Sequence, residues 1–356
     1  MFVREVFLVG VGATGFGRSG RTEEELGREA VAAALADAGL AASDVAAMSL
    51  SAGVGAAQRS ELPDLGLGTE RIAPVGRPTA WASRAMQMAW QAVAGGEYDV
   101  VLCAGIGTLA GEPESNGTLL HAQAAAAQHY MDASGATEEH LARVAAKNRT
   151  LGADNPRALL ATRVDAGDVM GSELLEWPLR RLMVAAHADG AAAVVFTSGA
   201  VRRRLGGHAA RVRASVLLGD SDAGDAISRA ALLAYQSSSL GPEEIDLAEV
   251  DDSTAAGEMA AYEALQFAPQ GQGPELVESA FTALGGVLPV NTSGGLLSQG
   301  EAIGASGIAQ VCEIAWQLRG EAGRRQVSGA RVGLALSARR APGRLPLVSL
   351  MILSGR

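Results

Sequence analysis

Residues 290–307 read Val-Asn-Thr-Ser-Gly-Gly-Leu-Leu-Ser-Gln-Gly-Glu-Ala-Ile-Gly-Ala-Ser-Gly, and we expect an apolar helix directly after them, over 308–318. Glycine lacks Cβ and tolerates positive φ, so such a loop lets backbone approach a ligand closely. The first amides of the following helix can face an anion or a carbonyl. The pattern fits an active-site loop, and it fits equally well a structural loop that packs small residues between helix and sheet. The substrate-binding candidates in it are Asn291, Gly294, Gly295 and Gly304.

The composition narrows the class of protein. The chain has 356 residues, 48% of them hydrophobic, and a net charge of −10, which disfavours nucleic-acid binding through a basic surface. Cys103 and Cys312 lie in apolar runs, so a reduced compartment fits better than a disulfide scaffold. The start shows no secretory pattern, and no apolar run approaches the roughly 20 residues of a membrane span. We expect a cytoplasmic protein without a membrane span.

The order of expected elements indicates a duplicated α/β fold. The expected elements of the first half are strands at 3–11, 44–51 and 100–104, a turn and core strand at 188–196, and helices at 23–38 and 80–94. The expected elements of the second half are strands at 211–218 and 245–250, helices at 224–235 and 255–267, the glycine-rich loop with its helix, and strands at 331–338 and 345–353. We place the halves at 1–207 and 208–356, with a helical insertion at about 111–187. The last two strands are expected to be antiparallel neighbours at the sheet edge.

Local signals support some of these assignments. Thr22 and Glu25 have the spacing of a capping box before the first helix, and Gly39 ends that helix. Residues 10–15 fit the dinucleotide pattern G-x-G-x-x-G, but that motif should open a helix at once and here the helix starts only near residue 22. We therefore interpret 10–15 as a flexible connection.

Several motifs carry a family resemblance. They are Gly95-Gly-Glu-Tyr-Asp99, Asp189-Gly-Ala-Ala-Ala193, Ala248-Glu-Val-Asp-Asp-Ser253, the loop from Asn291 to Ser298, and Ile303-Gly-Ala-Ser-Gly-Ile-Ala-Gln310. In this order they resemble the thiolase superfamily, most of all its sterol-carrier-protein-type branch of lipid-transfer thiolases. The resemblance implies two βαβαβαββ halves in a five-layered α/β/α/β/α body, and usually a dimer.

The same resemblance shows which reactive positions have changed. The nucleophilic cysteine of the family falls on Thr79, and the histidine of its Glu-Val-His-Asp segment falls on Asp251. The histidine of its Gly-His-Pro loop falls on Glu301, and the C-terminal proton-transfer position falls near Ser337. The two cysteines of this chain do not stand at these positions, and we expect both to be structural.

These changes argue against ordinary thiolase chemistry. A threonine hydroxyl is a poor nucleophile without an adjacent base. A carboxylate cannot donate a hydrogen bond to an oxyanion unless burial keeps it protonated, and an ionised carboxylate would repel the negative charge that develops in a Claisen transition state. Thiolytic and ketoacyl-condensing activities are therefore not expected.

Three functional hypotheses remain open. The first is an enzyme that cleaves an acyl thioester by a retro-aldol reaction, or an acyltransferase-related one, in which Asp251 or Glu301 acts as general base and Tyr262 or Ser337 assists. The second is a catalytically silent subunit that pairs with an active thiolase or ketosynthase homologue, or docks a small OB-fold acyl-CoA-binding protein. The third is a lipid- or acyl-CoA-binding protein.

Each candidate residue also has a structural interpretation. Asp251 could be solvated or could cap the helix at 255, and Glu301 could be a loop carboxylate favoured by a helix dipole. His187 fits a turn or packing residue, because no second ligand stands at metal spacing. No metal and no cofactor are expected, apart from a thioester of CoA or of an acyl carrier protein as substrate or ligand. The protein is expected to form a homodimer or a heterodimer with a thiolase homologue.

Overall fold

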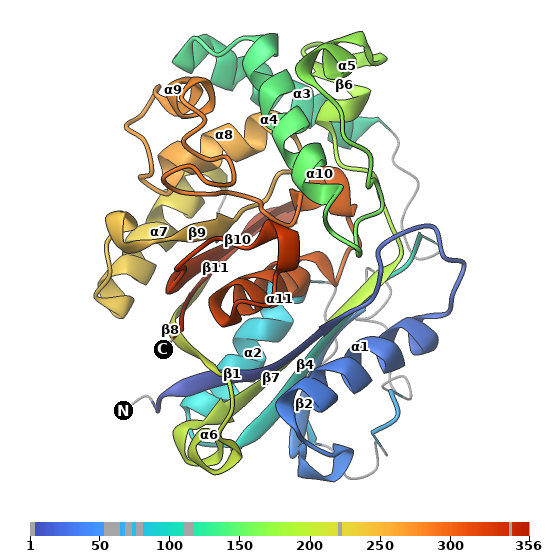
Figure 1. The fold of residues 1–356 in the computed structure, drawn as a ribbon, viewed down its shortest axis with the longest axis vertical. Coiled ribbons are helices and arrows are strands. Elements are labelled where there is room, and N and C mark those ends of the chain that lie inside the picture. The colour runs from blue at the N-terminus through green and yellow to red at the C-terminus, as the bar shows by residue number, and fades with distance from the viewer. Residues whose placement is uncertain are drawn as a thin grey trace.

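The structure is a computed structural model, and it describes residues 4–52, 65–67, 73–75, 81–109, 117–219, 223–341 and 344–355. Strands and helices alternate in both halves, and the strands of the two halves lie side by side in the lower and middle parts of the molecule (Figure 1). None of the described helices is long and apolar enough to cross a bilayer.

The first half forms one part of the sheet. Its elements are β1 (Val6–Ala13), α1 (Glu23–Ala38), β2 (Ala47–Ala52), β3 (Ala73–Pro74), α2 (Ala82–Ala94), β4 (Val100–Gly107), β7 (Gly190–Ser198) and α6 (Gly199–Leu205). The strands lie in the order β3-β2-β4-β7-β1. The predicted capping box at Thr22 is confirmed, since its hydroxyl accepts from the amide of Glu25, and Gly39 ends α1 with a φ of 64°.

The second half repeats this arrangement. Its elements are β8 (Ala210–Gly219), α7 (Ala223–Ser238), β9 (Leu247–Glu249), α8 (Ala255–Ala264), α10 (Gly295–Gln299), α11 (Ser306–Arg319), β10 (Val332–Ala341) and β11 (Arg344–Ser354). The strand order β8-β11-β10-β9 mirrors β1-β7-β4-β2 of the first half. The predicted duplication of the fold is therefore visible in the topology.

The layers follow from what each helix contacts. α1 contacts β1, β4 and β7, whereas α7 contacts β8, β10 and β11. α2 and α11 each contact strands of both halves, so they form a central layer between the two parts of the sheet. This gives the predicted α/β/α/β/α arrangement. The two parts are also continuous, because β1 pairs with β8 at one end to make a nine-stranded sheet.

One predicted detail of the sheet is wrong. β10 and β11 are antiparallel neighbours, as expected. They do not lie at the sheet edge, because β11 also pairs with β8 and β10 also pairs with β9. The sequence order of two adjacent strands predicts their pairing but not their place in the sheet, which the parallel crossover from β9 decides.

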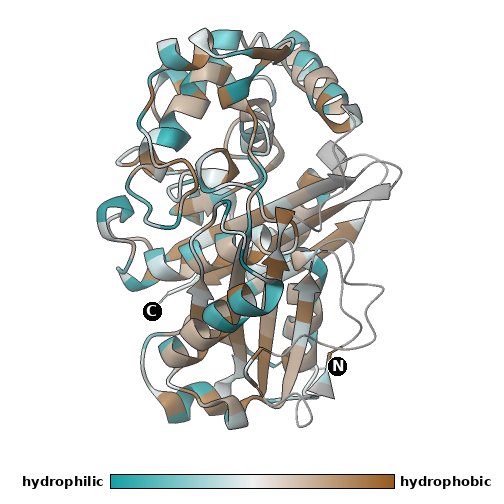
Figure 2. Cartoon of the chain, turned by 90° about the vertical axis from the view of Figure 1, so that its right-hand side faces the viewer, coloured by the Kyte–Doolittle hydropathy of each residue, from teal (hydrophilic) through white to brown (hydrophobic). Residues whose placement is uncertain are grey.

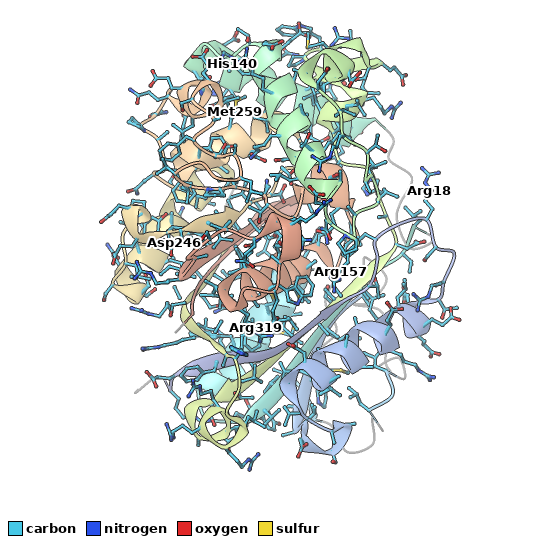
Figure 3. All side chains as sticks on the ribbon, viewed as in Figure 1. Arg18, His140, Arg157, Asp246, Met259 and Arg319 are labelled. Carbon is cyan, nitrogen blue, oxygen red and sulfur yellow. The ribbon has the colours of Figure 1, made fainter. Side chains whose placement is uncertain are left out.

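A helical layer covers the second half. Its elements are α3 (Thr118–Ser134), α4 (Glu138–Gly152), α5 (Ala166–Gly171), β5 (Leu174–Glu176), β6 (Leu179–Arg180) and α9 (Gly273–Glu278). α3 and α4 contact α8, and buried residues of all three belong to one hydrophobic cluster that includes Met259 (Figure 3). Figure 2 shows hydrophobic residues along the strands and more hydrophilic ones on the outer helices and turns.

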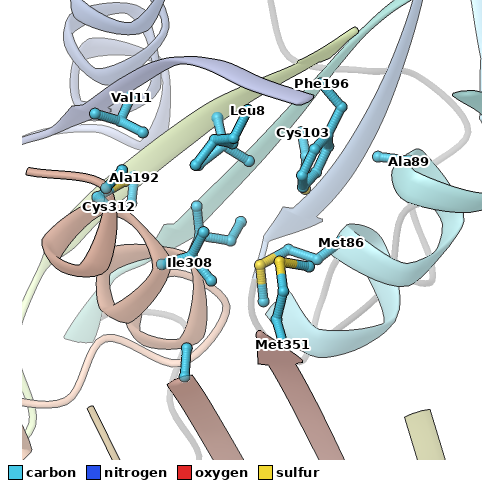
Figure 4. Packing of buried hydrophobic residues seen from close by; sticks show 14 of the residues in the cluster. Leu8, Val11, Met86, Ala89, Cys103, Ala192, Phe196, Ile308, Cys312 and Met351 are labelled. Carbon is cyan, nitrogen blue, oxygen red and sulfur yellow. The ribbon is translucent and has the colours of Figure 1, made fainter. Parts of the chain in front are cut away.

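The central layer has its own hydrophobic core. Met86 from α2, Ile308 from α11, Phe196 from β7 and Met351 from β11 meet there (Figure 4). On β4 the side chains alternate, so Cys103 faces this core while Leu102 belongs to the cluster under α1.

Two glycines of β4 let the glycine-rich loop lie directly on the strand. A Cβ on Gly105 would stand 2.1 Å from the carbonyl oxygen of Gly304, and a Cβ on Gly107 would stand 2.5 Å from that of Ile303. These carbonyl oxygens belong to the backbone, so they cannot move away from an added methyl group as the end of a flexible side chain could. Loop and strand therefore fit together only because these positions lack a side chain.

We predict that Gly105→Ala lowers the free energy of unfolding by about 3 kcal/mol or more, since an inserted methyl group in a tight contact forces backbone shifts. Urea or thermal unfolding followed by circular dichroism measures the change. Gly15→Ala is the matched control, because no atom lies within 4 Å of the added Cβ. Equal stabilities of the two variants would contradict the close packing of loop on strand.

Candidate functional site

A narrow cavity of about 20 Å³ lies where α2 and α11 begin. The described residues that line it are Trp81, Ala82, Ser83, Asp251, Leu296, Glu301, Ala302, Gly304, Ser306, Gly307, Gln310 and Ser337. The first amides of a helix have no carbonyl partner within it, and the helix dipole adds partial positive charge there. Two such helix ends face this cavity, together with two carboxylates and the three serines Ser83, Ser306 and Ser337.

Asp251 stands two residues beyond the end of β9. One of its oxygens accepts from the amide of Ser253 at 3.1 Å, and the other accepts from the amide of Ala338 at 3.3 Å. It does not cap α8, because the hydroxyl of Thr254 accepts from the amide of Gly257 and caps that helix instead. The backbone thus fixes the Asp251 carboxylate at the border of the cavity.

Glu301 is held by backbone on the opposite side. Its amide donates to the carbonyl of Ala186, and its carbonyl accepts from the amide of Ala188, so it runs beside residues 186–188. Only 5% of Glu301 is exposed. The Nδ1 atom of His187 lies 3.6 Å from a Glu301 carboxylate oxygen, and 36% of the His187 side chain is exposed. A histidine therefore stands directly beside the carboxylate at the position where the resemblance predicts a histidine.

A second cavity, of about 210 Å³, borders the same two carboxylates. We call it the apolar chamber; its described lining residues are Leu119, Ala122, Gln123, Ala126, Ala127, Tyr130, Ile227, Asp251, Ser253, Thr254, Ala256, Gly257, Ala260, Ala261, Glu301, Leu336 and Ala338. Asp251 and Glu301 line both cavities, whereas Ser337 lines only the narrow one. The structure thus brings three of the predicted catalytic residues to one place.

Neither cysteine lies at this place. Cys103 is fully buried in β4, and burial raises the pKa of its thiol far above the ordinary value. Cys312 is fully buried in α11, where burial raises the pKa of its thiol to about 12. Both thiols therefore stay protonated near neutral pH. Thr79, where the resemblance predicts the family's nucleophile, lies outside the described residues.

Tyr262 is placed elsewhere. It is fully buried and donates to the carboxylate of Glu258, which also accepts from Lys147 at 2.5 Å. Asn291 belongs to the same buried network, since its side-chain nitrogen donates to Glu258 at 2.6 Å and its side-chain oxygen accepts from the amide of Val250. Neither residue lines either of the two cavities. The network fixes the start of the loop, and the catalytic assistance expected of Tyr262 has no geometric basis.

Gly294 and Gly295 are also buried away from the cavities. A Cβ on Gly294 would stand 2.5 Å from the Cα of Gly152, and one on Gly295 would stand 2.0 Å from the Asp252 carboxylate. That carboxylate accepts from the amide of Leu296 at 2.6 Å and so caps the short helix α10. Of the four glycine and asparagine candidates for substrate binding, only Gly304 lines the narrow cavity.

Glu249 connects the loop to the end of β9. Its carboxylate accepts from the amide and the hydroxyl of Ser293 and from the hydroxyl of Thr292. Complete burial raises the pKa of Glu249 from its ordinary 4.5 to about 8, and repulsion by the nearby Glu313 carboxylate acts in the same direction. Glu313 itself pairs with Arg325 at 2.8 Å.

Comparison with known proteins identifies the family. The family "Thiolase C-terminal domain-like" matches residues 215–340. An acetyl-CoA acetyltransferase of Methanothermobacter thermautotrophicus is 33% identical over 365 aligned residues, covering 93% of this chain and 95% of that protein. This chain belongs to the thiolase superfamily.

Two further similarities place it within the superfamily. Sterol carrier protein 2 of Bos taurus is 33% identical over 374 residues, covering 92% of this chain and 69% of that protein. The solved structure of the Ltp2-ChsH2(DUF35) aldolase superposes with a TM-score of 0.85 at 25% identity, covering 99% of this chain and 98% of that one. The resemblance to the sterol-carrier-type branch that the loop motif predicted is confirmed.

The structure of this thiolase-superfamily protein adds site features that the sequence did not indicate. The sequence around His187 indicates only a turn or packing residue, and the parallel bridge of its backbone to Glu301 brings the imidazole to the carboxylate. The alanines of α3 lie far from the motifs in sequence, yet they form one wall of the apolar chamber. Among the described residues, no cluster of three or more histidine, cysteine or acidic side chains could hold a metal ion.

Glu249 should make the stability of the protein depend on pH. With a folded-state pKa of about 8 against an ordinary 4.5, the folded protein keeps a proton that the unfolded chain releases. The contribution of Glu249 therefore falls as pH rises through this window and is constant above it. We predict that the difference in unfolding free energy between wild type and Glu249→Gln shrinks or reverses from pH 5 to pH 8, as urea titrations would show. Glu139→Gln, on the exposed face of α4, should follow the wild type at every pH; a Glu249→Gln curve parallel to wild type would contradict the prediction.

Proposed function

We propose that this protein acts on an acyl thioester of CoA or of an acyl carrier protein and cleaves a carbon–carbon bond by a retro-aldol reaction that uses no cysteine. The observation that carries the proposal is the convergence of Asp251, Glu301 and Ser337 at a cavity faced by two helix N-termini. Support also comes from the 25% identical aldolase structure and from relatives whose names include acyl-CoA substrates.

The reaction needs groups of the kind that this cavity contains. A carboxylate, Asp251 or Glu301, removes the proton of a β-hydroxyl group, and the oxygen electron pair forms a carbonyl as the Cα–Cβ bond breaks. The bonding pair moves to Cα and is delocalised as the thioester enolate, which the amides at the start of α2 or α11 stabilise. Cα then takes back a proton, so that an aldehyde or ketone and a shortened acyl thioester leave.

Asp251 and Glu301 supply this chemistry better than a thiolase reaction. Both accept hydrogen bonds when ionised, and both border the narrow cavity and the apolar chamber. A Claisen reaction would require a thiolate, and both cysteine thiols are buried away from the cavities with raised pKa values. Ser337 lies beside Gly307 and can donate its hydroxyl proton to an oxygen in the narrow cavity.

We predict that Glu301→Gln and Asp251→Asn each lower kcat for retro-aldol cleavage of a β-hydroxyacyl-CoA, and that the residue acting as base loses roughly 10²- to 10⁴-fold, the usual contribution of a general base. Release of the aldehyde or ketone is followed with purified protein. Glu139→Gln and Asp132→Asn, both on exposed helix positions, are the controls and should keep wild-type rates. Full activity in both site variants would overturn the proposal.

His187 has a positioning role in this proposal. Its imidazole lies against the Glu301 carboxylate, and its backbone forms the bridge that fixes the Glu301 backbone. At 3.6 Å the imidazole contacts the carboxylate without a hydrogen bond, so the ring acts on Glu301 through packing and through its charge when it carries one. His187 therefore acts on the reaction through Glu301 and does not itself line either cavity.

A double-mutant cycle tests this role. We expect His187→Gln to lower kcat roughly tenfold with little change in KM, in line with coupling energies of contacting residues. In a Glu301→Gln background the same substitution should have almost no further effect, because the carboxylate it serves is gone. Additive losses in kcat, or a loss that appears only in KM, would show that His187 does not act through Glu301.

The partner hypothesis remains as a second candidate. The aldolase structure that resembles this chain names a second component, ChsH2(DUF35), which favours a complex of this chain with a partner protein. We propose a small OB-fold acyl-CoA-binding protein or a thiolase homologue as that partner, as an alternative or in addition to a homodimer. If the chain is a silent subunit, the complex stays active when Asp251 and Glu301 are both replaced. The same pair of substitutions in the purified complex therefore separates the two candidates.

A further inference from the structure

Two helices, α3 and α8, form opposite walls of the apolar chamber, and most of their lining residues are alanine or glycine. α3 contributes Leu119, Ala122, Gln123, Ala126, Ala127 and Tyr130, whose spacing of three or four residues places them on one face of the helix. At 1.5 Å per residue this face is about 16 Å long. α8 contributes Ala256, Gly257, Ala260 and Ala261 opposite it. Alanine and glycine side chains leave the space between the two helices open.

Tyr130 forms an uncharged part of the wall. Its hydroxyl donates to a carboxylate oxygen of Glu263 at 2.6 Å, and a Cβ on Gly273 would stand 2.2 Å from that hydroxyl, so the ring is fixed. Burial raises the pKa of Tyr130 far above its ordinary value, and the hydrogen bond to Glu263 is the second cause of this rise. The phenol therefore stays neutral and already has an acceptor.

The charges that line the apolar chamber are of one sign. Asp251 and Glu301 are the only charged residues among its described lining residues, and both lie where it meets the narrow cavity. A ligand bound in the apolar chamber would place its polar reacting group beside these carboxylates and its apolar part between α3 and α8. An anionic group on that apolar part would lose hydration without gaining a cationic partner from the described lining.

We propose that the apolar chamber binds the acyl group of the substrate and selects a neutral, bulky apolar acyl group of about eight carbon atoms over acetyl-sized and over carboxylated acyl groups. The size follows from the volume, since an apolar cavity of about 150 Å³ takes one benzene ring, and the apolar chamber has about 210 Å³. This inference rests on the proposed function, because it assumes that the reacting carbons lie beside Asp251 and Glu301.

Binding of unreactive sulfide analogues tests the inference without requiring turnover. In S-ethyl-, S-butyl-, S-octyl-, S-phenethyl- and S-dodecyl-CoA a sulfide replaces the thioester, and calorimetry gives the Kd of each. We expect affinity to rise about three- to fourfold per added methylene group up to about eight carbons and then to level off. S-(7-carboxyheptyl)-CoA should bind at least about tenfold more weakly than S-octyl-CoA.

Substitutions in opposite walls locate the effect. Ala126→Phe in α3 and Ala260→Phe in α8 should each weaken S-phenethyl-CoA at least about tenfold, because a phenyl ring would occupy the ligand's space, and should change S-ethyl-CoA less than twofold. Ala125→Phe is the matched control, since Ala125 is exposed on α3 and does not line the apolar chamber. Thermal unfolding confirms that the variants compared are folded.

The outcomes separate this inference from the proposed function. Four results would overturn the apolar chamber as the acyl site. The first two are an affinity that does not depend on acyl size and equal binding of the carboxylated analogue. The other two are no binding of the eight-carbon analogues, whether carried on CoA or on pantetheine, and an unchanged size preference in both chamber variants. A different result would separate the two proposals: the wild-type protein shows the size preference, the chamber variants lose it, and no β-hydroxyacyl thioester is cleaved. In that case the acyl site stands and the lyase proposal fails.

Discussion

The burial of residues 290–301 is the constraint on which the site depends. Every residue of this stretch is buried, although it contains only one short helix, α10. Buried backbone amides and carbonyls need partners, and a loop cannot supply them all from its own backbone. Side-chain acceptors meet this need: Glu249 binds the amide of Ser293, and Asp252 binds the amides of Leu296 and Leu297. The loop keeps its shape because carboxylates from the β9 segment bind its amides.

This need explains why acidic residues are concentrated around the site, and it separates two kinds of carboxylate. Carboxylates of the first kind are fully buried and already accept hydrogen bonds from the loop or from Lys147, the one lysine of the chain; they are Glu249, Asp252 and Glu258. Asp251 and Glu301 are held by backbone contacts at the border of both cavities. The first kind stabilises the scaffold, and only the second kind can contact a substrate.

The sequence predicted the fold well because the signals for it are local or repeated. Helix periodicity, the cap at Thr22 and the order of motifs were enough to give the duplicated layers. The site was predicted in part. Asp251, Glu301 and Ser337 do meet, since each follows from a motif position, whereas Tyr262, Asn291, Gly294 and Gly295 turned out to support the loop. A sequence shows that a glycine is needed, but only the neighbouring Gly152 and Asp252 show what it makes room for. His187 and the alanines of α3 come from segments without a motif, so nothing local pointed to them.

The placement of the His187 imidazole beside the Glu301 carboxylate sets the chemical character of the pocket. The resemblance predicts a histidine at this place in the glycine-rich loop, which could donate to an oxyanion; this chain presents a glutamate there, and the His187 imidazole stands behind it. Asp251 and Glu301, which border both cavities, are then proton acceptors, and the donors in the narrow cavity include the helix amides and the Ser337 hydroxyl. An acceptor on one side and fixed dipoles on the other favour a reaction that begins with loss of a proton and ends with negative charge on a thioester oxygen. Bond cleavage at a β-hydroxyl group has that order of events, whereas formation of an acyl-enzyme does not, so the proposed chemistry follows from the polarity of the pocket as well as from the absence of a thiolate.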